Sequence, residues 1–289
     1  RSEIGEVGEV FAAKQVGSNT IAMGGDPRKG NADRIRVAVE ILVAHGFKVL
    51  VAQNGLASTP AMSHAIRHLK AMGGIILTAS HNPWTDVGVK VNIETGAPAL
   101  PEMVDPIYDL QNKVTSYSRV DYNVALAEGQ IRIFDAIEVY AELLDQILDF
   151  KSMRHLLKEY ARNQGQLPRL ALDGMAGAAG PYAIEIFARR LGLDNAKFLR
   201  CVPDEYLGGN DSHGHALHPE PDFDYIENLI ELNASGDYDL VAAWDSDVDR
   251  RLDGGSGFWI ESADEFALFA RYGELIGIEI LDASVYLRK

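Results

Sequence analysis

The chain lacks the features of a disulfide-bonded or membrane-spanning protein. It has a single cysteine, Cys201, so an intrachain disulfide is excluded and a reducing compartment is favoured. No apolar run approaches the roughly 18 residues that a membrane-spanning helix needs, and the first residues, RSEIGEVGEV, lack the apolar stretch of a signal peptide. We therefore expect a soluble globular protein of the cytoplasm.

Positive charge is also scarce. Lysine and arginine number 27 against 42 aspartates and glutamates, which gives a formal net charge of −15 at pH 7. This balance argues against electrostatic binding to nucleic acid or to an anionic membrane. Any anionic ligand must be met by local positive charge, and a bound cation would ease the repulsion among the carboxylates.

Several familiar catalytic and nucleotide-binding motifs are absent from the sequence. The surroundings of Ser80 are not GxSxG, and there is no Walker sequence. The glycines of GMAGAAG, residues 174–180, have the wrong spacing for a dinucleotide-binding fingerprint. Close packing of a helix against a strand explains them adequately.

Strands alternate with amphipathic helices in the first half of the chain. Asn31 is expected to cap the first helix, and Ser58 or Thr59 the second. Such alternation predicts an α/β fold with a largely parallel sheet between helices, and functional loops beyond the carboxyl ends of the strands. The expected strands are residues 20–23, 47–53 and 75–79, and the expected helices are 31–46 and 58–74.

The pattern is interrupted near residues 149–151 and then begins again. A later short strand at 257–260 precedes an apolar helix that the capping-box pair Ser262 and Glu265 would open. We therefore expect two consecutive α/β domains with mixed, largely parallel sheets, residues 1–150 and 151–255, and the start of a third at 256–289. The further expected strands are 169–174, 196–202 and 239–244, and the helices are 179–192 and 224–236.

The strongest electrostatic signal is DSDVDR, directly after an apolar strand. Its three carboxylates, Asp245, Asp247 and Asp249, repel one another unless water or a cation screens them, and hard oxygen ligands suit Mg²⁺ or Ca²⁺. An EF-hand loop is excluded because its sixth position would be Arg250 and its twelfth Ser256. Spacing alone leaves a metal site and a solvated acidic turn as alternatives.

Ser80 follows a buried apolar strand in the stretch GGIILTASHNP. A serine after a strand is usually a turn former or helix cap, and the side chains of sequence neighbours diverge. Ser80 and His81 therefore do not by themselves form a pair of nucleophile and base. The local residues favour a turn.

A second group of candidate ligands is the histidine cluster in NDSHGHALHPEPD. His213, His215 and His218 suggest a zinc site, but without a partner cysteine and among glycines and prolines a mobile surface loop fits equally well. Lys90 and Arg28 are candidate ligands for an anion. Their spacing fits a solvated surface position as well.

Taken together, these segments resemble the α-D-phosphohexomutase family, and specifically its phosphoglucomutase branch. The resemblance rests on TASHNP followed by GVKVN, on QNGLASTPA and TGAPALPE, and on LDGMAGAAGPY, HPEPD and AAWDSDVDR in the family's order. It covers the chain from about Ser18 onward. TASHNP joined to a later D-x-D-x-D-R loop is much more specific than either part alone.

The resemblance implies a role for each candidate residue. Ser80 matches the serine that carries a phosphoryl group, and we expect it to face the 245–249 loop across a cleft between the two domains. His81 supports the serine loop, and Lys90 is a candidate for proton transfer or charge stabilisation. The Mg²⁺ ligands implied are Asp245, Asp247, Asp249 and an oxygen on Ser80, and the phosphate ligands are Arg250, Lys90 and Arg28.

The implied activity is the interconversion of glucose 1-phosphate and glucose 6-phosphate, with Mg²⁺ and with glucose 1,6-bisphosphate as activator and intermediate. The implied partners are a phosphosugar and a complementary chain that supplies the missing domains, because family members are longer. The alternative is a noncatalytic binding or scaffold protein, or an inactive fragment. Ser246 and Val248 stand where the family usually has glycine or alanine, and their side chains are expected to strain a tight metal loop.

Overall fold

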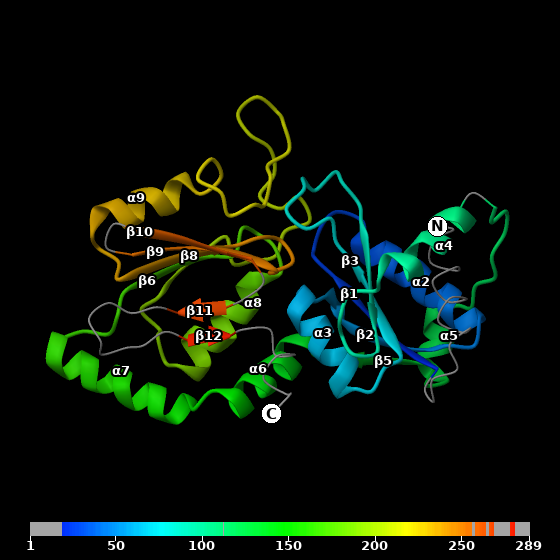
Figure 1. The fold of residues 1–289 in the computed structure, drawn as a ribbon, viewed down its shortest axis with the longest axis horizontal. Helices are drawn as coiled ribbons and strands as arrows, with labels where there is room; N and C mark the ends of the chain where they lie inside the picture. Colours follow the sequence, from blue (N-terminus) through cyan, green and yellow to red (C-terminus); the bar gives the residue numbers. More distant parts are fainter. Residues whose placement is uncertain (1–18, 112, 256–257, 264–265, 269–277, 281–289) are drawn as a thin grey trace. The chain divides into compact units, whose positions relative to one another are not determined.

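The computed structural model describes residues 19–111, 113–255, 258–263, 266–268 and 278–280 (Figure 1). Its contacts divide the chain into two compact units, Arg1–Ala79 with Thr85–Leu148, and Ser80–Trp84 with Asp149–Lys289. The short segment Ser80–Trp84 therefore packs with the second unit, although it follows a strand of the first. The functional assignment of the three expected domains stays a prediction.

A five-stranded sheet forms the centre of the first unit, in the order β4-β3-β1-β2-β5. The pairs among β3, β1, β2 and β5 are parallel, and only β4 runs antiparallel to its neighbour β3. The sheet is thus mixed and largely parallel, which confirms the expected fold class. The strands are β1 (Thr20–Gly25), β2 (Lys48–Leu56), β3 (Gly73–Leu77), β4 (Val89–Ile93) and β5 (Ile131–Phe134).

Helices cover both faces of this sheet (Figure 1). Along β3, Ile75 and Leu77 join one apolar cluster while Ile76 joins the other, because successive side chains point to opposite faces of a strand. Both faces are buried, which explains why this strand reads as a continuous apolar run. Residues of α2 (Asn31–Ala44), α4 (Pro101–Gln111) and α5 (Tyr122–Ala127) belong to the first cluster, and residues of α3 (Thr59–His68) and α6 (Ala136–Ile147) to the second.

The two expected helix caps have different outcomes. Ser58 caps α3, since its Oγ accepts a hydrogen bond from Ala61 N at 3.2 Å. The prediction for Asn31 is wrong, because Gly30 holds the cap position of α2 with a φ of 78°. The Asn31 amide instead donates to Leu77 O at 2.9 Å, where it joins the start of α2 to the end of β3.

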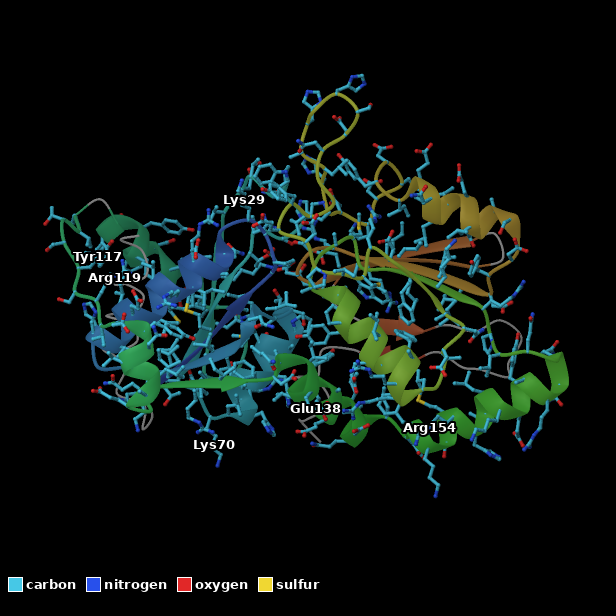
Figure 2. All side chains as sticks on the ribbon, turned by 180° about the vertical axis from the view of Figure 1, so that it is seen from behind. Lys29, Lys70, Tyr117, Arg119, Glu138 and Arg154 are labelled. Carbon is cyan, nitrogen blue, oxygen red and sulfur yellow. The ribbon has the colours of Figure 1, made fainter. Side chains whose placement is uncertain are left out.

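The buried carboxylate of Glu40 on α2 is paired with two arginines. Glu40 accepts a hydrogen bond from Arg119 Nε at 2.8 Å, and Arg36 Nε lies 3.5 Å from its second oxygen. Arg119 lies beside Tyr117 at the edge of the first unit (Figure 2). These contacts pair the Glu40 carboxylate with positive charge in a nearly dry position.

The second unit has its own five-stranded sheet, in the order β10-β9-β8-β6-β7. The pairs of β6 with β7 and β8 are parallel, and the pairs of β9 with β8 and β10 are antiparallel. The strands are β6 (Leu170–Asp173), β7 (Lys197–Leu199), β8 (Leu240–Trp244), β9 (Arg250–Gly255) and β10 (Phe258–Ala263).

Helices flank the second sheet as well (Figure 1). Leu229 of α9 (Glu227–Ser235) packs with Val241 and Ala243 of β8. Trp244, the next residue of β8, contacts Phe187 of the π-helical turn η1 (Ile184–Arg190), with ring centroids 6.4 Å apart. The two remaining helices of this unit are α7 (Phe150–Gln164) and α8 (Ala179–Ala183).

The helix expected after Ser262 is wrong for the residues that the structure describes. Ser262 and Ala263 belong to β10, where they pair with Arg251 and Arg250 of β9, and residues 266–268 form β11 (Phe266–Leu268). Pairing across the ladder overrides the local capping signal. β11 pairs with β12 (Ile278–Ile280), and the rest of the expected third domain lies outside the described residues.

Among the helices that the structure describes, none combines the length and the apolar character needed to cross a membrane.

Candidate active site

A buried network fixes the point at which β3 ends and the Ser80 segment begins. Thr78 Oγ1 donates to Asp26 Oδ2 at 2.7 Å, and Asn31 Nδ2 donates to Asp26 Oδ1 at 3.0 Å. The Arg28 guanidinium, itself fully buried, pairs with Asp26 at 2.8 Å. The Asp26 carboxylate therefore joins the ends of β1 and β3 and forms an ion pair with Arg28. The expected phosphate-binding role of Arg28 stays a prediction.

Ser80 lies against the carboxylate loop of residues 245–249 within the second unit, whereas the expected cleft between two domains stays a prediction. Its hydroxyl donates to Asp245 Oδ2 at 3.1 Å and to Asp249 Oδ1 at 3.4 Å. Ser246 Oγ donates to the Ser80 carbonyl at 2.5 Å, so side chain and backbone of the serine are both held. Ser80 has a φ of 50°, a left-handed conformation that residues other than glycine adopt at a cost of about 1–3 kcal/mol and that is common at functional sites.

The three aspartates form a tight group of like charges. One ligand atom from each of Asp245, Asp247 and Asp249 lies within 4.8 Å of the others, and the first two residues are fully buried. Burial, together with the charges of Asp247 and Asp249, raises the pKa of Asp245 well above its ordinary value. A buried site with only oxygen ligands fits a hard divalent cation such as Mg²⁺, which would offset this repulsion.

Glu220 connects the two loops of the site. Its Oε1 accepts a hydrogen bond from Arg250 Nη1 at 3.2 Å and lies 3.9 Å from His81 Nε2. Arg250 N also donates to Asp245 Oδ1 at 3.1 Å, which fixes the arginine beside the aspartates. The motif HPEPD alone predicts no role for Glu220, because no local pattern links it to residues 30 and 139 positions away.

A second loop, residues 174–178, supports the carboxylate loop from behind. Ala178 N donates to Ser246 O at 2.8 Å, and Gly177 lies so close that an added Cβ would stand 2.5 Å from Ser246 Cα. Met175, Ala176 and Val248 have φ values of 45°, 57° and 69°. The strain expected at Val248 is therefore present. The glycines of residues 174–180 do more than pack a helix against a strand, because Gly177 packs on the carboxylate loop.

Replacing Gly177 by alanine is expected to displace the carboxylate loop and weaken Mg²⁺ binding by about tenfold or more. The new methyl group would overlap backbone atoms of Ser246, and these cannot relieve the overlap by a change of rotamer as a side chain could. Isothermal titration with Mg²⁺ measures the effect. Gly129→Ala is the control, since it adds the same methyl group in the first unit, where no atom lies within 4 Å and only the φ of 74° opposes it. Equal Mg²⁺ affinity in both variants would contradict the support role.

The histidine cluster does not form a metal site in the described part of the chain. His213 and His215 are exposed with ring centroids 6.4 Å apart, and His218 stacks on Tyr225. Among the described residues, the three aspartates are the one group of three or more His, Cys, Asp and Glu side chains placed to share an ion. The geometry thus favours a surface loop over zinc.

Two other side chains with reactive groups, Cys201 and Lys90, lie in different units. Burial raises the pKa of the Cys201 thiol to about 11, so it stays protonated near neutral pH and is a poor nucleophile. Lys90 lies half-buried on β4, paired in register with Ile76 of β3. Its expected role at the phosphate stays a prediction.

Comparison with known proteins supports the same reading of the residues. The sequence model of phosphoglucomutase/phosphomannomutase, alpha/beta/alpha domain I, matches residues 4–118, which include the Ser80 segment. The phosphoglucomutase of Emericella nidulans is 34% identical over 269 residues, covering 89% of this chain and 46% of the relative. Phosphoglucomutase-1 of Oryctolagus cuniculus is 36% identical over 272 residues, covering 87% and 46%.

A solved structure shows the same architecture. The exocytosis-sensitive phosphoprotein pp63/parafusin of Paramecium, a phosphoglucomutase crystallised in its open form, is 30% identical with a TM-score of 0.75. The similarity covers 89% of this chain and 50% of that one. The chain thus spans about half the length of the relatives it matches.

Proposed function

Since the chain belongs to the α-D-phosphohexomutase family, in its phosphoglucomutase branch, we propose that it transfers phosphoryl groups on a phosphosugar. The specific reaction proposed is the interconversion of glucose 1-phosphate and glucose 6-phosphate through a phosphoserine and glucose 1,6-bisphosphate. One observation carries this proposal above the others. The Ser80 hydroxyl lies 3.1 Å from a carboxylate of a group suited to a divalent cation.

The proposed cycle consists of two transfers in opposite directions. In the first, the bond from phosphorus to Ser80 Oγ breaks, a bond to a sugar hydroxyl oxygen forms, and the proton of that hydroxyl is released while Ser80 Oγ regains one. The bisphosphate then presents its other phosphoryl group: the bond from phosphorus to the sugar oxygen breaks, a bond to Ser80 Oγ forms, and the proton that Ser80 Oγ loses is balanced by one that the freed sugar oxygen gains. The sugar phosphate leaves with its phosphate on the other position, so atoms and charge balance.

Charge is the main obstacle to this chemistry, and the site is built to meet it. Phosphoryl transfer requires an in-line acceptor and neutralisation of the charge on three equatorial oxygens. Asp245, Asp247 and Asp249 would hold Mg²⁺, and the ion when bound would neutralise phosphoryl charge. Without a cation, the aspartates would repel a phosphoserine that carries about −1.5 to −2 charge.

The remaining polar groups have proposed roles at the same phosphate. Arg250, fixed by Asp245 and Glu220, supplies positive charge beside Ser80. His81 Nδ1 is buried and has no hydrogen-bond partner among the described residues, which leaves it for a phosphate oxygen or water. Lys90 is proposed for proton transfer or charge stabilisation, and Arg28 as a further phosphate ligand.

The same proposal extends to the setting of the enzyme. The proposed partner is a phosphosugar. The location is the cytoplasm. Residues 1–150 are proposed as a phosphoserine-loop domain and residues 151–255 as a metal-binding-loop domain, with the Ser80–Trp84 segment packed in the second unit.

A coupled mutase assay tests the proposal. The chain is incubated with glucose 1-phosphate, glucose 1,6-bisphosphate and Mg²⁺, and glucose 6-phosphate is followed by its dehydrogenase. Mg²⁺-dependent product formation is expected, and its loss on chelation is the control. A phosphate on the chain without turnover would instead support the noncatalytic alternative, and neither phosphate nor turnover would contradict the proposal.

A further inference from the structure

We infer that the loop from Asp204 to Glu220 positions Ser80 for transfer, with Trp84 as the main anchor of the serine segment. This inference rests on the proposed function for its catalytic consequence. Its structural content is that residues 80–84, which follow a strand of the first unit, pack with the second unit through side chains of this loop.

The anchor is an indole ring held at its edge and at its nitrogen. The Trp84 ring meets Tyr206 edge to face, with centroids 5.0 Å apart and planes 77° apart. Its Nε1 donates to Asn210 Oδ1 at 3.3 Å. An aromatic ring pair with this geometry adds attraction beyond the area that it buries, and the hydrogen bond fixes the rotation of the indole.

The other end of the serine segment meets the same loop. His81 Nε2 lies 3.9 Å from Glu220 Oε1, and Glu220 also holds Arg250. Contacts at both ends of a five-residue segment restrict its path. Ser80 needs this restriction because its φ of 50° is a conformation that a free loop would leave.

The loop itself has a firm base beside the carboxylate loop. The Asp204 side chain accepts hydrogen bonds from Tyr206 N at 3.2 Å and Gly208 N at 3.3 Å, which makes a tight turn under the aromatic pair. Asp204 N donates to Ala176 O at 2.9 Å, next to Gly177, which packs on Ser246. Trp84 therefore fixes Ser80 relative to the loop of residues 174–178, which also supports the aspartates.

A short antiparallel contact closes the loop beside Asn210, which holds the Trp84 indole. Asn210 and Ala216 form an antiparallel bridge, and Asp211 accepts hydrogen bonds from the amides of His213 and His215 at 2.8 Å. Asn210, the acceptor for the indole, thus stands at the base of a closed hairpin. Its side chain starts from a fixed backbone, as a positioning contact requires.

Hydrogen–deuterium exchange of the full chain tests the positioning directly and needs no activity. Trp84→Ala is expected to raise amide exchange in peptides covering residues 79–90 while peptides of both sheets keep theirs. Asn210→Ala removes only the acceptor of the indole and is expected to give a smaller local rise. Tyr108→Ala is the matched control, because this aromatic residue on α4 is 57% exposed and its loss is expected to change nothing.

Kinetics then separate positioning from binding. Misplacement of a reacting group lowers the rate of the chemical step by about 10- to 100-fold, so Trp84→Ala is expected to lower kcat by that factor with KM changed less than about threefold. Trp84→Phe keeps the ring contact and loses the donor, and is expected to recover most of the rate. A structural role alone would not give this ordered recovery.

The outcomes are distinguishable. If the wild-type chain shows no turnover, the proposed function fails while the exchange result still decides this inference. Unchanged exchange over residues 79–90 in Trp84→Ala overturns it. If exchange rises throughout Trp84→Ala, the variant has lost its fold, and Asn210→Ala decides in its place: a local rise supports the anchor and no rise overturns it.

Discussion

Ser80→Ala is expected to lower turnover by at least about a thousandfold. The proposed cycle stores the phosphoryl group on Ser80 Oγ, and alanine offers no atom to accept it. The Cys201 thiol does not replace it, since this thiol is buried with a pKa of about 11. The coupled mutase assay, run at saturating glucose 1,6-bisphosphate, measures the loss.

Two further serine variants control for indirect effects of this substitution. Ser246→Ala keeps the nucleophile and removes the hydrogen bond to the Ser80 carbonyl, so a partial loss is expected. Ser235→Ala removes a hydroxyl that donates to Leu232 O and accepts from Asp237 N at the end of α9, both local contacts, and full activity is expected. If Ser80→Ala retained turnover close to that of Ser235→Ala, the nucleophile would have to be another residue.

Asp245→Asn is expected to abolish most of the stabilisation that Mg²⁺ gives and to stabilise the metal-free chain. Saturation at about 100 times the dissociation constant stabilises a folded protein by about 2.7 kcal/mol, and the variant is expected to lose most of that gain. Asparagine has nearly the same shape but removes one of three crowded charges, so the metal-free variant is expected to melt at or above the wild-type temperature. Thermal melts with and without Mg²⁺ measure both effects.

The pH dependence of these melts follows from the direction of the Asp245 pKa. Below the ordinary value of 3.8 the carboxyl is protonated in both states and contributes nothing. As pH rises from there to the raised folded pKa, the folded state holds more protons than the unfolded state, so the metal-free chain loses stability. Mg²⁺ is therefore expected to raise Tm more at about pH 7.5 than at about pH 4.5.

Asp194→Asn is the control for the removal of charge, because it deletes a carboxylate from the exposed surface of the same unit. It is expected to keep the Mg²⁺ response and its pH dependence. The metal account would be contradicted if Asp245→Asn and Asp194→Asn gained equally from Mg²⁺ at both pH values.

Hydrophobic patterning predicted the strands and helices that surround the site. A run such as GIIL of β3 is buried on both faces, and its composition alone is sufficient to identify it. Patterning missed β4 and β5, which lie at the two edges of their sheet, where fewer apolar residues are needed. It also misread the segment after Ser262, because a local capping signal says nothing of the β9 partner.

The site shows a similar limit of local information. Ser80 and Asp245 are 165 positions apart, so no window on either could reveal that they meet, and the family resemblance supplied that link. Gly177, Glu220 and Trp84 carried no such signal. Their importance depends on which backbone or side chain lies opposite them, which is a property of the fold.

The account depends most on Ser80 as the acceptor of the phosphoryl group. The chain is incubated with glucose 1,6-bisphosphate and Mg²⁺, digested, and examined by tandem mass spectrometry. A phosphoryl group on Ser80, absent from the Ser80→Ala variant, is the predicted result. A phosphoryl group on any other residue with Ser80 unmodified would contradict the account.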